Sequence, residues 1–282
     1  MDSPHDNGGS FIWQFMIKFT KSVGRPGGSG KILFNWFRSK PHTRVRSAPL
    51  GSRIYAIGDI HGRLDLLESL EEMIARDAAE DTPARRVIVD LGDYVDRGME
   101  VRQVVDRLLA RALDGFETVY LKGNHEDFLL RFLDDVQIGA GWLRNGGNTT
   151  LYSYGIRPPE RPTDVAALQR ARDELQRRLP PGHLDFYRGL KHSHVEGDYF
   201  FAHAGVMPGR PLDRQAPEDL MWIREDFLDC PDDYGKIVVH GHTIAEQPDV
   251  RANRIGIDTG AYATGCLTAV VLEGTTHRFL QT

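Results

Sequence analysis

The sequence predicts an α/β fold in which short strands alternate with helices, followed by a second run of strands. From Arg53 onward, apolar stretches of strand length alternate with segments whose apolar residues recur at helical spacing. After residue 190 the pattern changes to closely spaced strands, which indicates a second sheet packed against the first. A chain of 282 residues is long enough for one large domain with a sizeable core.

The first half of the chain contains three strand–helix pairs. Strands are expected at Arg53–Gly58, Val87–Leu91 and Phe116–Leu121. Helices are expected to follow them at Leu64–Ala78, Val101–Leu113 and Glu126–Phe132. Because successive strand–helix units favour parallel pairing, these strands should form a largely parallel central sheet.

Residues 137–190 interrupt this alternation. The stretch Trp142–Gly155 is rich in Gly, Asn and Thr and indicates a loop, whereas Thr163–Leu179 predicts a polar helix. An insertion between strands that carry polar motifs is expected to form a cap that selects the substrate. The second sheet is expected to contain strands near Lys191–Val195, Tyr199–His203, Lys236–His240, Arg254–Asp258 and Cys266–Leu272.

Residues 1–50 differ in composition from residues 51–282, which we expect to form the folded domain. The first 50 residues are rich in Gly and aromatic residues and carry eight Lys or Arg against two Asp, a net charge of +6. The remainder therefore carries −11 of the total of −5. We expect a basic, flexible leader; the alternative is an arm that contacts a membrane surface or a partner protein.

The composition also excludes several classes of protein. An acidic folded part argues against nucleic acid as the main partner. The chain contains two cysteines, Cys230 and Cys266, without a CxxC pair, which fits a reducing cytoplasm. No segment approaches the roughly 20 apolar residues that a membrane-spanning helix needs.

Each of the first three predicted strands ends in a short polar motif. These motifs are Gly58–Gly62 (GDIHG), Gly92–Gly98 (GDYVDRG) and Gly123–Glu126 (GNHE). Because the carboxyl ends of parallel strands meet at one edge of a sheet, the three motifs should lie together. Two later strand-like segments lead to His203 and His242. The combined carboxylate, amide and imidazole groups suit a pair of divalent transition metals.

The spacing of these residues indicates how two metals would be shared. A carboxylate that bridges two metals holds them roughly 3.5–4 Å apart, and the water between them becomes a hydroxide nucleophile. Asp93 is the natural bridge. One metal would be held by Asp59 and His61, and the other by Asn124, His203 and His242.

The three motifs, in this order and spacing, resemble those of the PPP family of metallophosphoesterases, which includes eukaryotic protein Ser/Thr phosphatases and their bacterial and phage relatives. The likeness continues through the His203 strand, Met221–Glu225, His240–Thr243 and Ile257–Ala261, and so covers about residues 53–274. It implies a calcineurin-like metallophosphoesterase fold, with two packed mixed β-sheets, flanking helices and a cap insertion.

The resemblance also implies a role for each motif residue. The two metals would be divalent, with Mn²⁺ expected first and Fe or Zn²⁺ as alternatives. His242, rather than His240, would be a ligand. His125 would be the general acid, Asp96 the carboxylate that orients it, and Arg97 and Arg224 the guanidinium groups that hold the phosphoryl oxygens. The metal ligands would be Asp59, His61, Asp93, Asn124, His203 and His242.

The expected reaction is hydrolysis of phosphomonoesters on protein Ser or Thr, with Tyr as a further substrate. The main alternative is symmetrical hydrolysis of dinucleoside polyphosphates such as diadenosine tetraphosphate. Relatives of that kind usually lack the Val-Asp-Arg-Gly form and have Asp in place of Glu126, so Asp96 and Glu126 favour the phosphoprotein substrate. An inactive phosphoprotein-binding scaffold would lack a ligand or the acid, and the sequence lacks none.

Overall fold

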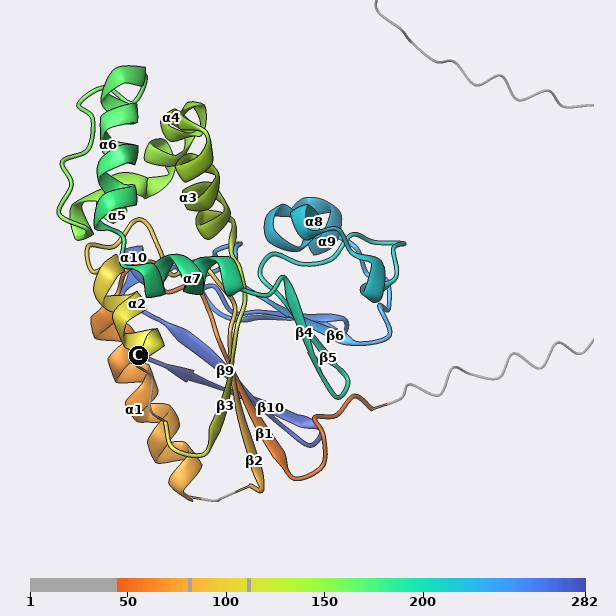
Figure 1. Cartoon of the computed structure of the whole chain (residues 1–282). Coiled ribbons are helices and arrows are strands. Elements are labelled where there is room, and N and C mark those ends of the chain that lie inside the picture. The colour runs from red at the N-terminus through yellow and green to blue at the C-terminus, as the bar shows by residue number, and fades with distance from the viewer. Residues whose placement is uncertain (1–44, 81–82, 111–112) are drawn as a thin grey trace, which may run out of the picture. The chain divides into compact units, whose positions relative to one another are not determined.

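A five-stranded mixed sheet forms the centre of the domain (Figure 1). The computed structural model describes residues 45–80, 83–110 and 113–282. The strands of this sheet lie in the order β10-β9-β1-β2-β3, in which β1, β2 and β3 are parallel and β9 and β10 are antiparallel. Their bounds are β1 Ser52–Ile57, β2 Arg85–Asp90, β3 Phe116–Tyr120, β9 Thr268–Glu273 and β10 Thr276–Gln281.

A second five-stranded sheet has the order β4-β5-β6-β8-β7, with β5, β6 and β8 parallel. The prediction that Cys266–Leu272 belongs to this sheet is wrong, because β9 pairs with β1 in the first sheet. An apolar strand pattern shows that a strand is buried but not which of two facing sheets it joins. The bounds are β4 Ser193–Glu196, β5 Tyr199–Ala202, β6 Ile237–His240, β7 Asp249–Val250 and β8 Arg254–Gly256.

Alternating side chains of the strands build two separate cores. Ile54 of β1 packs with Phe201 and Val239 between the two sheets. Its neighbour Tyr55 packs on the other side, with the helices that cover the first sheet. The order of layers is therefore helix, sheet, sheet, helix, as the predicted fold class requires. The outer helices are α1 Leu64–Glu80 and α2 Val101–Leu109 on the first sheet, and α8 Pro217–Trp222 and α9 Glu225–Leu228 on the second.

The insertion is helical and packs on α3 (Asn124–Asp134), the helix that follows β3. The loop expected over Trp142–Gly155 is wrong: the segment forms the end of α4, a π-helical turn and α5. Poor helix formers adopt helix here because Trp142, Leu151 and Tyr154 are buried, and such packing overrides local propensity. The elements are α4 Gly139–Trp142, the π-helical turn Leu143–Gly147, α5 Asn148–Ser153, α6 Val165–Arg178 and α7 Pro181–Gly189.

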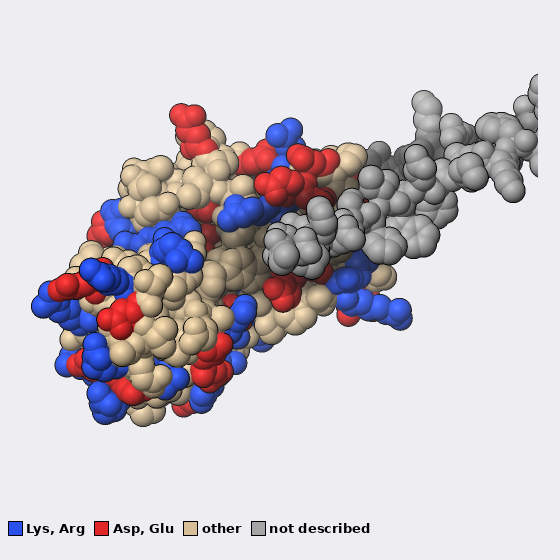
Figure 2. Space-filling view, turned by 90° about the horizontal axis from the view of Figure 1, so that it is seen from above, with Lys and Arg blue, Asp and Glu red and all other residues tan. Residues whose placement is uncertain are grey.

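The folded part begins before residue 51. Arg46 pairs with Asp233 at 2.7 Å, and the buried Ala48 donates its N–H to Gly274 O at 2.8 Å. Residues 1–44 of the expected leader, including its proposed membrane contact, lie outside the described residues. No helix in the described ranges has the length and apolar character to span a bilayer. On the face shown in Figure 2, positive and negative side chains are interspersed.

Candidate metal centre

Three loops meet at the carboxyl ends of β1, β2 and β3. The N–H groups of Ile60 and His61 donate to Asp93 O at 3.2 and 2.8 Å, which ties the first motif to the second. The third motif approaches even more closely, because a Cβ atom at Gly123 would overlap the Asp93 carboxylate. Glycine at that position therefore allows the loops to come together. The strand order thus assembles motifs that are separated in the sequence.

The backbone of these loops is strained in a way that marks the site. Among the described residues, five non-glycine residues have positive φ angles, between 46° and 69°. Such conformations cost roughly 1–3 kcal/mol each and persist where surrounding structure enforces them. All five belong to the predicted site: His61, Asp93, Asp96, Arg97 and His242.

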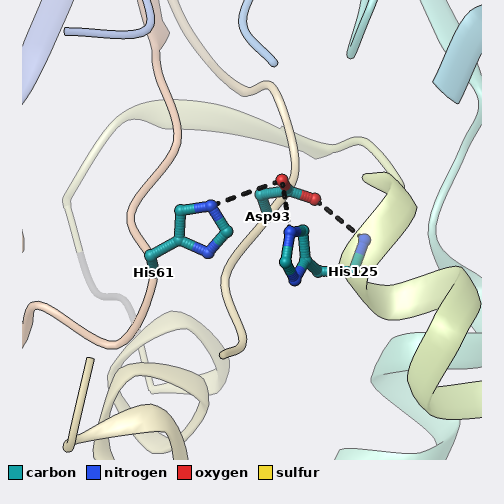
Figure 3. A group of neighbouring side chains, drawn as sticks. All are labelled: His61, Asp93 and His125. Atoms are coloured by element: carbon teal, nitrogen blue, oxygen red, sulfur yellow. Dashed lines mark hydrogen bonds and ion pairs between the residues drawn. The ribbon is translucent and has the colours of Figure 1, made fainter. Parts of the chain in front are cut away.

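Asp93 lies at the centre of the cluster, with its two carboxylate oxygens facing different histidines. Oδ2 is 3.4 Å from His61 Nε2 and 3.8 Å from His125 Nε2 (Figure 3). Oδ1 is 3.4 Å from His203 Nε2. Two groups of ligand atoms, each within 4.8 Å, therefore share Asp93: His61–Asp93–His125 and Asp93–His203–His242. This arrangement gives one carboxylate a place in two candidate metal sites.

The other predicted ligands surround this carboxylate. Asn124 Oδ1 lies 3.0 Å from His203 Nε2. Asp59 is buried, and its carboxylate accepts the backbone N–H of His242 at 3.1 and 3.2 Å. On the His61 side, the third nearby ligand atom belongs to His125 rather than to Asp59. The structure thus brings all six predicted ligands together, with Asp59 turned toward the loop of His242.

Two orphaned nitrogen atoms test whether the residues fit a metal. His61 Nε2 and His242 Nε2 are buried and have no hydrogen-bond partner among the described residues. His61 Nδ1 lies 2.7 Å from Val95 O, which fixes the proton on Nδ1 and leaves the Nε2 lone pair facing Asp93. One divalent cation at each of these nitrogens would supply the missing partner, and the mixed nitrogen and oxygen donors suit transition metals. The residues therefore fit the expected metals.

Three of the candidate ligands, His61, Asp93 and His242, are in the ionisation state that binds a cation. Burial lowers the pKa of His61 to about 3 and, together with the charge of His203, that of His242 to about 2, so both rings are neutral near pH 7. Burial opposes ionisation of Asp93, but the neighbouring His203 and His125 hold its pKa well below its usual range. The Asp93 carboxylate and the neutral rings of His61 and His242 can therefore accept a cation. His203 must lose a proton when a metal binds, because burial, which lowers its pKa, is outweighed by the charges of Asp93 and Asp59, which raise that pKa to about 10.

His240 lies outside this cluster although it is two residues from His242. Its Nδ1 is 3.1 Å from Gly241 O, and its ring packs edge-on against Phe227 with ring centres 5.1 Å apart. Burial lowers its pKa to about 4. The ring is therefore a neutral part of the packing beneath the second sheet.

His125 and Asp96 form a buried pair beside the metal cluster. His125 Nδ1 lies 2.7 Å from Asp96 Oδ2, which leaves Nε2 facing the site. Burial lowers the pKa of His125, but the charges of Asp93 and Asp96 outweigh it and raise that pKa above its ordinary value. The ring is therefore suited to carry a proton at neutral pH.

Two arginines approach the cluster from different sides. Arg97 Nη2 lies 3.2 Å from His125 Nε2, and its guanidinium stacks on the ring of Tyr262 at 4.6 Å. Arg224 precedes α9, and its Nη1 donates to Thr243 Oγ1 at 3.3 Å, one residue beyond His242. Both predicted arginines therefore lie at the edge of the site.

Glu126 holds the backbone of the second motif through hydrogen bonds. Its buried carboxylate accepts four backbone N–H groups, those of Asp93, Tyr94, Val95 and Gly123, at 2.8 to 3.1 Å. Burial and the charge of Asp93 raise the Glu126 pKa to about 7. This side chain joins the loops that carry Asp93 and Asn124.

Three residues to which the sequence assigned no role contact the site. Trp142 and Thr150 reach Asp96 from the insertion, and Tyr262 lies beside His61 with ring centres 5.5 Å apart. No pattern in the sequence indicates that Trp142 or Thr150 contacts Asp96. Tyr262 comes from the short helix α10 (Ala261–Thr264).

A model of the calcineurin-like phosphoesterase family matches residues 52–262. The chain belongs to this family. The match includes strands β1 to β8 and every motif described above, and it ends before β9 and β10. It therefore joins the fold and the metal cluster to a family of metal-dependent hydrolases.

Curated relatives of this family member include asymmetrical bis(5'-nucleosyl)-tetraphosphatases. That of Anoxybacillus flavithermus is 25% identical over 239 residues and covers 76% of this chain and 88% of its own length. That of Geobacillus thermodenitrificans is 28% identical over 236 residues, with the same coverage. The crystal structure of a protein described as a diadenosine tetraphosphatase superposes with a TM-score of 0.51 at 22% identity, covering 83% of this chain and 98% of the other, and shows the shared fold.

Proposed function

We propose that this calcineurin-like phosphoesterase hydrolyses phosphomonoesters with two divalent metal ions, and that its substrates are phosphorylated Ser and Thr in proteins, with Tyr as a further substrate. The observation that carries the proposal is the sharing of Asp93 between two histidine groups, next to the His125–Asp96 pair. One cluster thus combines the means to hold two cations with the means to supply a proton.

The metals, when bound, would acidify a water molecule and neutralise charge on the phosphoryl group. Their proposed ligands are Asp59, His61, Asp93, Asn124, His203 and His242. We propose Mn²⁺ as the first choice, with Fe or Zn²⁺ as alternatives, because histidine and carboxylate ligands accept all three.

The remaining residues act on the substrate itself. Arg97 and Arg224 would hold the phosphoryl oxygens with paired N–H donors as charge develops. The water oxygen bonds to phosphorus, the bond from phosphorus to the alcohol oxygen breaks, and the proton on His125 Nε2 passes to that oxygen. Asp96 would stabilise the protonated ring before the transfer.

The second motif and Glu126 support the phosphoprotein substrate. Asp96 and Arg97 belong to the Val-Asp-Arg-Gly form, which dinucleotide-cleaving relatives usually lack. Glu126 fits its position closely, because each of its oxygens accepts two backbone N–H groups. A shorter Asp at this position would reach fewer of them.

A specific observation favours dinucleoside polyphosphates as a second candidate. A hollow of about 460 Å³ next to Arg97 is lined by Arg144, Asn145, Asn148 and other polar groups, and the described residues that line it include no carboxylate. Arg144 is exposed and forms no ion pair within the described part of the chain. A cationic hollow beside the phosphate site would suit further phosphates of a leaving group. The curated relatives are named for such a substrate.

A comparison of substrates decides between the candidates. The protein should be stripped of metal, reloaded with Mn²⁺, Fe²⁺ or Zn²⁺ separately, and assayed on a phosphothreonine peptide and on diadenosine tetraphosphate. Our proposal predicts the higher kcat/KM on the peptide. A kcat/KM higher by orders of magnitude on the dinucleotide would overturn it. The products, two ADP or AMP with ATP, would then show which bond of the tetraphosphate is hydrolysed.

Arg144→Ala provides an internal control for the second candidate. If the hollow binds a polyphosphate leaving group, this variant should raise KM for the dinucleotide about tenfold, the loss of one charge-assisted contact. Hydrolysis of the peptide should change less than twofold. Equal effects on both substrates would remove the argument from the hollow.

A further inference from the structure

The Asp96 carboxylate is held by two side chains of the insertion. Thr150 Oγ1 donates to Asp96 Oδ1 at 2.6 Å, and Trp142 Nε1 donates to Oδ2 at 2.9 Å and to Oδ1 at 3.1 Å. His125 supplies the remaining contact through Nδ1. All four side chains are at least nine-tenths buried. The carboxylate therefore has a single orientation, fixed on one side by His125 and on the other by the insertion.

The same segment also fixes the backbone of the motif. Thr150 Oγ1 accepts the N–H of Asp96 at 3.0 Å, so one hydroxyl contacts both the backbone and the side chain of this residue. Gly146 O accepts the N–H of Arg97 at 3.3 Å. Asp96 and Arg97 both have positive φ angles, 69° and 67°, which non-glycine residues rarely adopt without such support.

Two glycines allow the segment to approach this closely. Gly146 has φ of 108°, and a Cβ atom there would lie 2.9 Å from Arg97 N. A Cβ atom at Gly147 would overlap the ring of Trp142. The sequence Trp142–Thr150 is therefore built to place one indole N–H, one hydroxyl and one carbonyl on Asp96 and Arg97.

We propose that Trp142 and Thr150 are positioning residues, which hold Asp96 so that His125 Nε2 faces the leaving-group oxygen. The inference rests on the proposed function, because it takes His125 as the proton donor. It gives the insertion a part in proton delivery in addition to covering the site. Neither side chain touches the substrate; both act through Asp96.

The leaving group provides the test, because a poor leaving group needs the proton and a good one does not. Mn²⁺-loaded wild type, Thr150→Val and Trp142→Phe should be assayed on a phosphothreonine peptide and on p-nitrophenyl phosphate. General acid catalysis contributes about 10²–10⁴-fold, so a misplaced acid should lower kcat on the peptide by about tenfold. With p-nitrophenyl phosphate the loss should be about twofold or less, and KM should stay within about twofold on both substrates.

Three controls separate positioning from a general structural effect. Thr150→Ser restores the hydroxyl and should restore kcat on the peptide. Thr163→Val makes the same chemical change at an exposed site of the insertion and should leave both activities unchanged. On a His125→Ala background, Thr150→Val should lower kcat no further, because the residue through which it acts is gone.

Each outcome has a distinct meaning. Equal losses on both substrates, loss of bound Mn²⁺ from Thr150→Val or Trp142→Phe, or a further loss on the His125→Ala background would overturn the positioning role. If the wild type is active on the peptide and Thr150→Val and Trp142→Phe have the same kcat as the wild type, the positioning role is also overturned. The proposed function would then remain intact. A wild type inactive on both substrates would refute the proposed function, and this inference with it.

Discussion

Glu126 offers the sharpest prediction about how the site is held together. Each of its carboxylate oxygens accepts two backbone N–H groups: Tyr94 and Val95 at Oε1, and Asp93 and Gly123 at Oε2. In Glu126→Gln one oxygen is replaced by an NH₂ group, which cannot accept. Two buried N–H groups would then lose their partner.

The expected cost follows from these two donors. A buried donor left without a partner costs about 1–3 kcal/mol, so two donors cost about 2–6 kcal/mol. We expect a destabilisation of about 3 kcal/mol, in the lower half of that range. For a domain of this size the midpoint of thermal unfolding should fall by about 6–12 °C. The displaced Asp93 should also weaken Mn²⁺ binding.

Thermal unfolding by circular dichroism and Mn²⁺ titration by calorimetry measure both effects. Glu72→Gln is the matched control, because Glu72 is 73% exposed and its pair with Arg76 is long, at 3.8 Å; it should change stability by less than about 0.5 kcal/mol. The free-energy cost of burying the Glu126 charge opposes the stabilisation from its hydrogen bonds, and the same burial raises the pKa of Glu126 to about 7. A Glu126→Gln variant as stable as wild type would show that this cost cancels the four hydrogen bonds, and would refute the reasoning.

Three further predictions follow from individual contacts. Gly241→Ala would place a Cβ atom into the Asp59 carboxylate, so the amount of bound metal should fall by at least half. Gly189→Ala, with no atom within 4 Å of its Cβ position, should bind as much metal as wild type. Unchanged metal content in Gly241→Ala would count against Asp59 as a ligand. Arg97→Lys should lower kcat/KM on phosphomonoesters by about 10²-fold, because an ammonium lacks the paired donors, and a loss below about threefold would contradict the role of Arg97. Burial opposes ionisation of Asp77, but hydrogen bonds from Arg278 and Tyr55 hold its pKa below the ordinary value. The ionised Asp77 therefore stabilises the folded protein above about pH 4, and this stabilisation is lost as pH falls through the folded pKa. The stability gap between wild type and Asp77→Asn should therefore narrow in acid, and a constant gap would contradict this.

The fold and the positions of the motifs were predictable because both rest on local patterns. The strand Arg85–Asp90, for example, contains the short apolar run Val87–Val89, and the motif Gly92–Gly98 begins two residues after the strand ends. In a parallel sheet this is sufficient to bring Asp93 near His61. The spacing of the motifs therefore carried most of the information about the metal cluster.

The contacts of the insertion could not be predicted, since they depend on long-range packing. Trp142 and Thr150 lie 46 and 54 residues from Asp96 in the sequence, and nothing in their spacing relates them to it. The segment between them has the composition of a loop, and it folds as helix because residues such as Leu143 are buried. For the same reason the sequence could not assign β9 to the first sheet.

The central claim is that Asp93 bridges two metal ions, and anomalous diffraction from Mn²⁺-loaded crystals tests it most directly. We predict two anomalous peaks roughly 3.5–4 Å apart, one on each side of the Asp93 carboxylate. One should contact His61 and the other His203 and His242. A single peak, or two peaks of which only one contacts Asp93, would contradict the account.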